Sequence, residues 1–167
     1  MKVFDAINEY AGRLCSWATL FMVILICIEV ILRYLFSKSI IWMVELEIYF
    51  FAASFLLASG YALKYDKHVR VDVLYSNWSE RKQAWTNLLG CIFFLIPWCI
   101  IAIIGTYKYA LISWRIGEVS QQPGGLPAVY LLKSIVVIGF VLLFIQALSL
   151  SIKSYLIIQG KYKLELP

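Results

Sequence analysis

Four long apolar stretches constrain this chain more than any other feature of its sequence. They lie at about residues 14–36, 46–64, 84–108 and 134–156, and their few charges stand near the ends. A charge at the centre of a bilayer costs about 2.5–3.5 kcal/mol, and about 20 helical residues cross the hydrocarbon core. Runs such as FMVILICI lack the alternation of a membrane β-strand. We therefore expect an all-α protein with four transmembrane helices, forming a single membrane domain over residues 1–167.

The composition supports a lipid environment and excludes several other classes of protein. Of the 167 residues, 62% are hydrophobic and 15% are charged, against roughly 45–50% and about 25% in a soluble domain. So much apolar surface cannot be buried in one core of this size. A soluble enzyme, a disordered chain and a secreted disulfide scaffold are excluded. The net charge of +5 is interpreted as a marker of membrane topology, and no nucleic-acid partner is expected.

The distribution of Lys and Arg predicts the orientation of the four helices. About ten of these residues lie at the two ends of the chain and in the middle connection, and about five lie in the other two connections. Basic residues accumulate on the cytoplasmic side of membrane proteins. We therefore expect both termini in the cytoplasm. The first apolar run follows a basic residue, as in a signal peptide, but no small-x-small cleavage site comes after it, so we expect a retained helix.

The middle connection, residues 65–83, carries a helical apolar pattern. Val71, Leu74, Tyr75 and Trp78 recur at i, i+3, i+4 and i+7. This spacing predicts an amphipathic helix that lies along the lipid headgroups, with basic residues near anionic lipid. The alternative is a solvated loop whose pattern has no structural role.

The residues that would support chemistry are scarce. His68 is the only histidine, which excludes a haem held by two histidines. The four cysteines stand singly inside the apolar stretches, without a C-x-x-C motif, and are expected to be small apolar side chains of the helix contacts. No P-loop motif is present. We therefore expect no enzyme activity, no catalytic residue, and no cofactor or metal site in this chain.

A few polar residues inside the apolar stretches are more informative. Glu29 and Arg33 are spaced i, i+4, so they can pair on one helix face. The pair either belongs to a proton or substrate relay, or is structural and lies at the outer interface or a protein contact. Trp42 is expected to anchor the start of the second helix at the interface, close to Glu45. Gln146 is expected to form a hydrogen bond between helices.

Five motifs in order resemble one family of membrane proteins. They are E-V-x-x-R-Y at residues 29–34, W-x-x-E at 42–45, K-H-x-x-V-D at 67–72, and E-x-S followed by P-G-G-L-P within 117–133. This order is similar to that of the DctQ-type small membrane subunit of tripartite ATP-independent periplasmic (TRAP) transporters. Met43 and Val44 depart from the pattern, because many relatives carry an acidic or small residue there.

The resemblance implies a division of labour in the bacterial cytoplasmic (inner) membrane. A periplasmic binding protein would capture an organic anion, and a large membrane subunit would hold the substrate and sodium sites of the symport and move like an elevator. This chain would be the small permease subunit, a scaffold that packs against the large subunit and membrane lipids. Candidates for the subunit or lipid interface are Glu29, Arg33, Trp42, Glu45, His68, Asp72, Trp78 and Gln146.

The connection between the third and fourth stretches is the second candidate surface. Its prolines and glycines predict a structured turn. We expect it to contact the binding protein or the large subunit, and the alternative is a turn that only joins two helices. The candidate docking residues are Glu118, Ser120, Pro123, Gly124, Gly125 and Pro127.

Two other functions remain open at this point. One is a self-sufficient small transporter or channel that works as a homo-oligomer, with Glu29 as its coupling acid. The other is the membrane anchor subunit of a redox complex.

Overall fold

The computed structural model describes residues 2–65 and 78–161, and every regular element within these segments is helical. The elements are α1 (Lys2–Phe36), α2 (Ile41–Lys64), α4 (Glu80–Gly90), the π-helix η1 (Cys91–Leu95), α5 (Ile96–Ile116) and α6 (Val129–Ile158). The elements α4, η1 and α5 follow one another without a break and form one rod. Within the described segments four helices are long and apolar enough to cross a membrane. The expected all-α fold with four spanning helices is confirmed.

Each of the four helices extends beyond the apolar stretch that predicted it. The first begins at Lys2 instead of residue 14, and the second begins at Ile41 instead of residue 46. Charged residues mark where the hydrocarbon ends, but helical hydrogen bonds continue into the headgroup region, so charge alone places helix ends too far inward. Most of the predicted amphipathic stripe, together with His68 and Asp72, lies outside the described residues.

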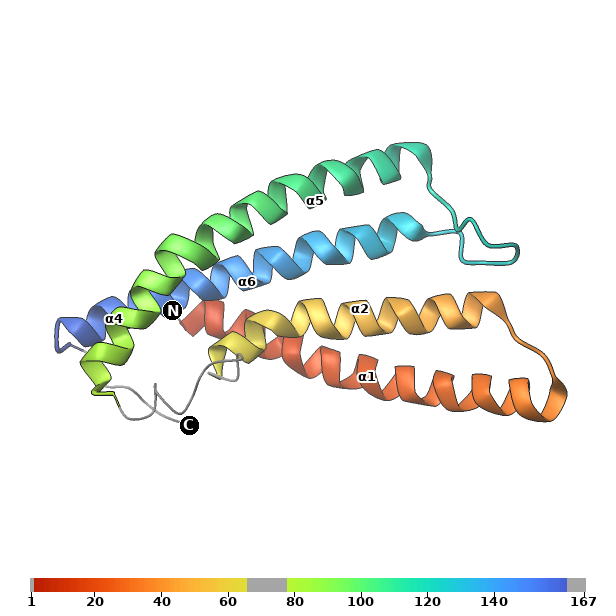
Figure 1. Ribbon diagram of the computed structural model, residues 1–167, viewed down its shortest axis with the longest axis horizontal. Helices are drawn as coiled ribbons and strands as arrows, with labels where there is room; N and C mark the ends of the chain where they lie inside the picture. The colour runs from red at the N-terminus through yellow and green to blue at the C-terminus, as the bar shows by residue number, and fades with distance from the viewer. Residues whose placement is uncertain (1, 66–77, 162–167) are drawn as a thin grey trace.

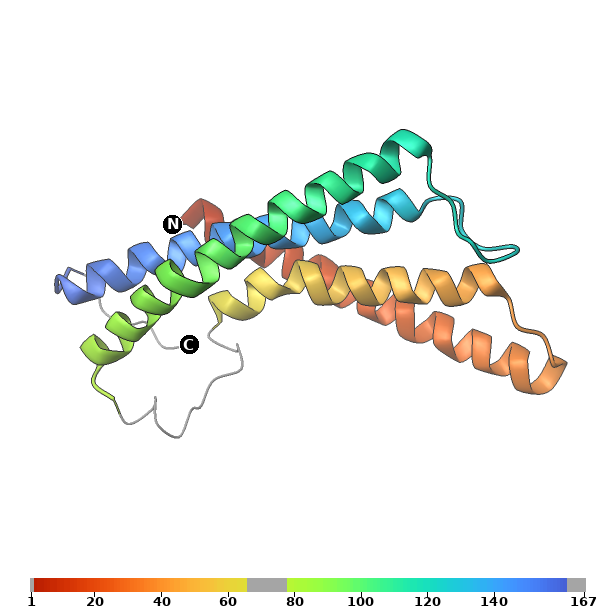
Figure 2. The ribbon, with the colours of Figure 1, turned by 45° about the horizontal axis from the view of Figure 1, so that its top comes forward.

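The four long helices lie side by side in one layer (Figure 1). α2 and α6 pack against each other in the centre, α1 flanks α2, and α5 flanks α6. The first turns of α1 also reach α6, and α4 packs on the far part of α6. The turn at residues 37–40 and the loop at residues 117–128 lie together at one end of the layer, here named the loop end (Figures 1 and 2).

Small residues allow the backbones to approach closely where the helices cross. Gly12 lies against the ring of Tyr61, and Gly139 lies against Leu56. Gly60 is buried between the side chain of Asn8 and the backbone oxygen of Leu142, so α1, α2 and α6 meet at this one glycine. Lipid provides no hydrophobic drive between helices, so contacts of this kind supply the van der Waals packing that holds them together.

A small apolar core connects α2, α5 and α6. Leu63 of α2, Cys99 of α5, and Leu143 and Ala147 of α6 are buried together. The four cysteines are free, and all except Cys27 are buried. Cys99 is completely inaccessible and occupies a position in this core, as expected for a small apolar side chain.

A π-helical turn precedes Pro97 in the third span. Proline has no N–H, and its ring clashes with the carbonyl four residues earlier, which here belongs to Phe93. The five residues of η1 contain that carbonyl, and the wider π-helix gives the ring space without ending the helix. The rod formed by α4, η1 and α5 curves along its length (Figure 1).

The substitution Gly60→Ala tests the close approach of the three helices. A Cβ atom at this position would collide with Oδ1 of Asn8 and lie 3.1 Å from the backbone oxygen of Leu142. Overpacking of this kind costs about 1–3 kcal/mol, so we expect a lower midpoint of thermal unfolding for the protein in detergent. Gly105→Ala is the matched control. Nothing lies within 4 Å of its Cβ, and alanine favours a helix interior by about 1 kcal/mol. Equal midpoints for wild type and Gly60→Ala would contradict the described packing.

Candidate functional site

The described charged side chains gather near the two ends of the helical layer. Residues 14–28, 48–63, 84–107 and 134–152 form the central parts of the four spans, and they contain no Asp, Glu, Lys, Arg or His. Within the described segments, no group of three or more His, Cys, Asp or Glu residues could hold a metal ion. The charged side chains therefore form two separate groups, one at each end of the layer.

At the end opposite the loops, a network that we name the N-terminal polar cluster joins α1 to α6. Asp5 accepts hydrogen bonds from Nε2 of Gln146 at 3.2 Å and from Oγ of Ser149 at 3.0 Å, and it forms an ion pair with Nζ of Lys153 at 2.7 Å. Nδ2 of Asn8 donates to Oε1 of Gln146 at 3.0 Å. Both amide side chains are almost completely buried. The cluster therefore fastens the first helix to the last.

Helical spacing explains why these side chains meet. Asp5 and Asn8 are three residues apart on α1, and the three residues of α6 are spaced i, i+3 and i+7, so each set lies on one face. Sequence reasoning singled out Gln146 as an interhelical residue but missed the other four members of the cluster, of which Asp5 and Asn8 bond to it directly. The available signal was the spacing of Ser149 and Lys153, which follow Gln146 by three and seven residues and so share its helix face.

Glu9 extends the contacts of this end to α2. One carboxylate oxygen accepts from Nζ of Lys64 and from Oη of Tyr65, both at 2.6 Å. The other accepts from Nε of Arg13 at 3.4 Å. The first helix is thus fastened to both central helices by carboxylates one turn apart.

At the loop end, Glu29 and Arg33 form the pair that their spacing predicts. Both Nε and Nη2 of Arg33 donate to the same oxygen of Glu29, at 2.9 and 2.5 Å. Oγ of Ser39 also donates to that oxygen at 3.4 Å. Glu29 is buried, whereas the side chain of Arg33 is about half exposed. Glu47 of α2 lies within electrostatic range of both, and its Oε1 is buried without a hydrogen-bond partner.

Glu45 holds the loop between α5 and α6, an arrangement that we name the loop clamp. Its Oε2 accepts from the backbone N–H of Leu126 at 2.6 Å, and its Oε1 accepts from Oγ of Ser120. A Cβ atom on Gly125 would lie 2.7 Å from Oε1 of Glu45, so only glycine allows this approach. Gly124 has a φ of 76°, a left-handed conformation that favours glycine. The loop is therefore tied to the second turn of α2.

A second contact ties the same loop to α6. Nζ of Lys133 pairs with a carboxylate oxygen of Glu118 and lies 3.7 Å from the ring centroid of Tyr109. The Lys133 ammonium holds the pKa of the Glu118 carboxyl below its usual range. A depressed pKa means that this pair contributes stability above the pKa of the unfolded carboxyl and loses it as the pH falls through the folded value. The pair therefore persists at neutral pH.

The candidate docking residues divide into two groups. Glu118, Ser120 and Gly125 are half-buried and take part in the contacts just described. Pro123, Gly124 and Pro127 are exposed, as are the side chains of Gln121 and Gln122 beside them. Sequence reasoning proposed Glu45 and the loop as separate candidates, and the structure brings them together.

The tryptophans expected at the interface lie at the ends of helices. Trp42 in the first turn of α2 and Trp78 just before α4 are both exposed. Trp114, in the last turn of α5, donates its Nε1–H to Oγ of Ser134 at 2.7 Å and packs on the ring of Tyr130.

A layer of apolar helices, fastened by polar contacts at its ends and uncharged in its centre, defines a small multi-pass membrane protein. The model of the family described as "Tripartite ATP-independent periplasmic transporters, DctQ component" matches residues 22–155. The chain belongs to this family of transporter components, which confirms the resemblance found in its motifs.

One curated relative supports the same assignment. The "C4-dicarboxylate TRAP transporter small permease protein DctQ" of Vibrio cholerae is 29% identical over 105 residues, which are 63% of this chain. The matched part covers 44% of that relative, less than half of its length. No solved structure matches the chain.

The substitution Glu45→Ala tests the loop clamp. A hydrogen bond to a charged group contributes about 1.5–3 kcal/mol, so we expect loss of the carboxylate to free the loop. Amide hydrogen exchange at residues 119–127 should become faster, most of all at Leu126, whose N–H loses its acceptor. Gln121→Ala is the control, because this side chain is exposed at the tip of the same loop. If Leu126 exchanged at the wild-type rate in Glu45→Ala, the clamp would be contradicted.

Proposed function

We propose that this chain is the small, static membrane subunit of a TRAP transporter and packs against the scaffold of a large membrane subunit. The observation that carries the proposal is the absence of charge from the centres of all four spans. An ion or organic anion that crosses a membrane needs polar groups near the midplane. A partner must therefore supply the transport pathway.

The exposure of the helices supports the same role. In the most apolar windows of α1, α2 and the rod, only 11%, 6% and 11% of the residues are buried within the chain. A single layer leaves both of its faces free, so they contact either lipid or another subunit. A subunit of this shape enlarges the anchored area of a transporter whose other domain moves, through van der Waals packing and a few polar contacts.

The substrate and ions belong to the proposed partners. The large subunit would hold the substrate and the coupling sodium ions, and a periplasmic binding protein would deliver the organic anion. The name of the Vibrio cholerae relative makes a C4-dicarboxylate one candidate for that anion. This chain contributes no residue to the transport pathway in our proposal.

We place the chain in the inner membrane with both termini in the cytoplasm. The excess of Lys and Arg at the chain ends and in the middle connection supports this orientation. The loop end then faces the periplasm. Its exposed tip around Pro123 is the surface that we propose for the docked binding protein, while Glu118 and Ser120 keep the tip in position.

The homo-oligomeric alternative would need Glu29 to exchange protons or ions during transport. The Glu29 carboxylate instead accepts two hydrogen bonds from Arg33 and lies near one end of its span. No charged residue continues a path from Glu29 along α1 until Arg13. These observations favour a structural pair.

Assembly provides the direct test of the proposed role. We expect this chain to co-purify with a tagged large subunit encoded beside it, and an unrelated four-span membrane protein expressed at the same level should not. Liposomes with both subunits and the binding protein should take up the anion in a sodium gradient. Uptake by liposomes that contain this chain alone would overturn the proposal.

The docking surface requires a variant that leaves the loop contacts intact. Glu118→Lys is unsuitable, because it would place a second ammonium beside Lys133. Gln121→Arg adds bulk and charge at the exposed tip, and we expect it to reduce uptake severalfold at low concentrations of binding protein and little at high concentrations. Ser79→Arg, at the exposed start of α4, is the matched control at the opposite end. Equal uptake by both variants at every concentration would exclude docking at the tip.

A further inference from the structure

One acidic side chain of α2 has no partner within the described part of the chain. Glu47 lies in the second turn of the helix, and its Oε1 atom is buried without a hydrogen-bond donor. Among the described residues, neither of its oxygens takes part in a hydrogen bond or an ion pair. An ionisable side chain inside a membrane protein is costly unless it is paired, so a residue of this kind points to a partner.

The cations at the loop end of α1 and α2 do not neutralise Glu47. Arg33 directs both Nε and Nη2 to one oxygen of Glu29, so its single charge is balanced there. Lys38, in the turn between the two helices, is exposed and forms no ion pair within the described residues. Glu47 lies within electrostatic range of Glu29 and Arg33, and these three side chains together carry one net negative charge. The missing complement is a cation from outside this chain.

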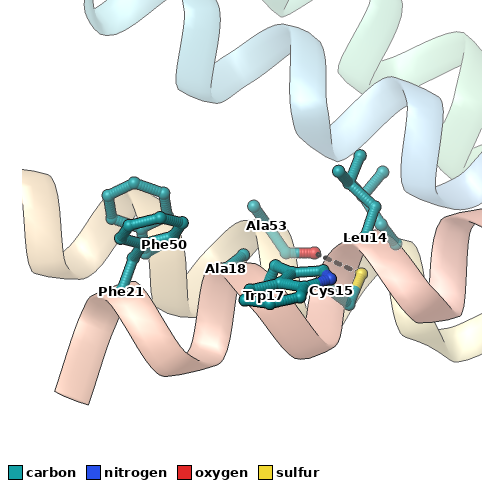
Figure 3. A pocket seen from close by; sticks show the side chains of 8 residues that line it. Leu14, Cys15, Trp17, Ala18, Phe21, Phe50 and Ala53 are labelled. Carbon is teal, nitrogen blue, oxygen red and sulfur yellow. Dashed lines mark hydrogen bonds between the residues drawn. The ribbon is translucent and has the colours of Figure 1, made fainter. Parts of the chain in front are cut away.

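An exposed aromatic surface of α2 begins one turn after Glu47. Phe51 and Phe55 follow it at i+4 and i+8, so the three side chains lie along one side of the helix. The two rings stack with centroids 6.4 Å apart and are 60% and 71% exposed. Figure 3 shows a different side of α2, where the ring of Phe50 stacks on Phe21 of α1. The contact with α1 therefore leaves Phe51 and Phe55 uncovered.

The depth of Glu47 distinguishes a protein partner from a lipid headgroup. Trp42 is an exposed tryptophan in the first turn of α2, and tryptophans of this kind lie at the level of the headgroups. Glu47 follows it by five residues, a rise of about 7 Å into the span. The ammonium of a phospholipid stays at the headgroup level, whereas a helix can carry a Lys or Arg side chain to any depth. A helix can also continue along Phe51 and Phe55 toward the middle of the span.

We propose that Glu47, Phe51 and Phe55 form a docking surface for a transmembrane helix of the large subunit, and that a Lys or Arg side chain of that helix pairs with Glu47. The inference rests on the proposed function, because the large subunit is the partner that the function requires. The rings provide van der Waals packing, which associates helices in lipid. The ion pair fixes the depth of one helix against the other, and it balances the charge that Glu29 and Arg33 leave.

Co-purification with a tagged large subunit tests the ion pair. Glu47→Gln keeps the size of the side chain and removes its charge, which leaves the cation of the partner unpaired in the contact. We expect the amount of this chain recovered per large subunit to fall about tenfold or more. Glu80→Gln, an exposed acidic residue at the start of α4, is the matched control and should give the wild-type ratio. The thermal midpoint of Glu47→Gln purified alone should not fall, because the carboxylate has no bond within the chain.

A photoreactive benzoylphenylalanine in place of Phe55 tests the aromatic part of the surface. We expect illumination to cross-link it to the large subunit. Cross-links only to lipid or to a second copy of this chain would contradict the inference, as would a lower thermal midpoint for Glu47→Gln alone. If wild type and Glu47→Gln co-purified equally well with the large subunit, the inference would fail while the proposed function stood. If the wild type did not co-purify, both would fail.

Discussion

The hydrogen bond from Asn8 to Gln146 is the contact on which the arrangement of the helices depends. Lipid offers no hydrogen bonds, so a polar side chain on a membrane helix is stable only where the protein supplies a partner. These two amides are almost completely inaccessible, and they join residues 138 positions apart in the sequence. A bond of this kind contributes about 0.6 kcal/mol on average and up to about 1.7 kcal/mol. Its larger effect is on geometry, because Asn8 also lies against Gly60 and so fixes α1 against α2 and α6 together.

The opposite end of the layer is fastened by different chemistry. There the carboxylate of Glu45 binds a loop through a backbone N–H and a hydroxyl, and Lys133 holds the beginning of the same loop through Glu118. Between the two ends the helices meet through glycines and apolar side chains. Polar contacts at both ends prevent the helices from sliding along one another, and the central parts of the four spans contain no charged residue. Both properties agree with the static role that we propose for this chain.

Much of the fold could be predicted from the sequence because lipid imposes strict demands. Because a charge at the bilayer centre is costly, the uncharged stretches predicted the four helices. The i, i+4 spacing was sufficient to pair Glu29 with Arg33. Contacts between distant segments were not predictable in this way. Glu45 and Ser120 were both candidates, yet nothing local indicates that they meet across 75 residues. Asp5 and Asn8 were missed because they precede the apolar stretch and resemble ordinary polar residues of a helix end. Pro97 stood inside a long apolar run, and its missing N–H was the signal for the π-helical turn.

The bond between the first and last helices also has a consequence for biosynthesis. The ribosome completes α1 long before it reaches residue 146, so Asp5 and Asn8 enter the membrane region while their partners on α6 do not yet exist. Until α6 is inserted, those side chains can be satisfied only by their own helix, as in the hydrogen bond from Asn8 to the backbone oxygen of Phe4, and by water and headgroups at the membrane surface. The final packing of α1 is therefore a late event, and a chain truncated within α6 would display unpaired polar groups near its amino terminus. The first helix therefore reaches its final packing only after the last helix has been inserted.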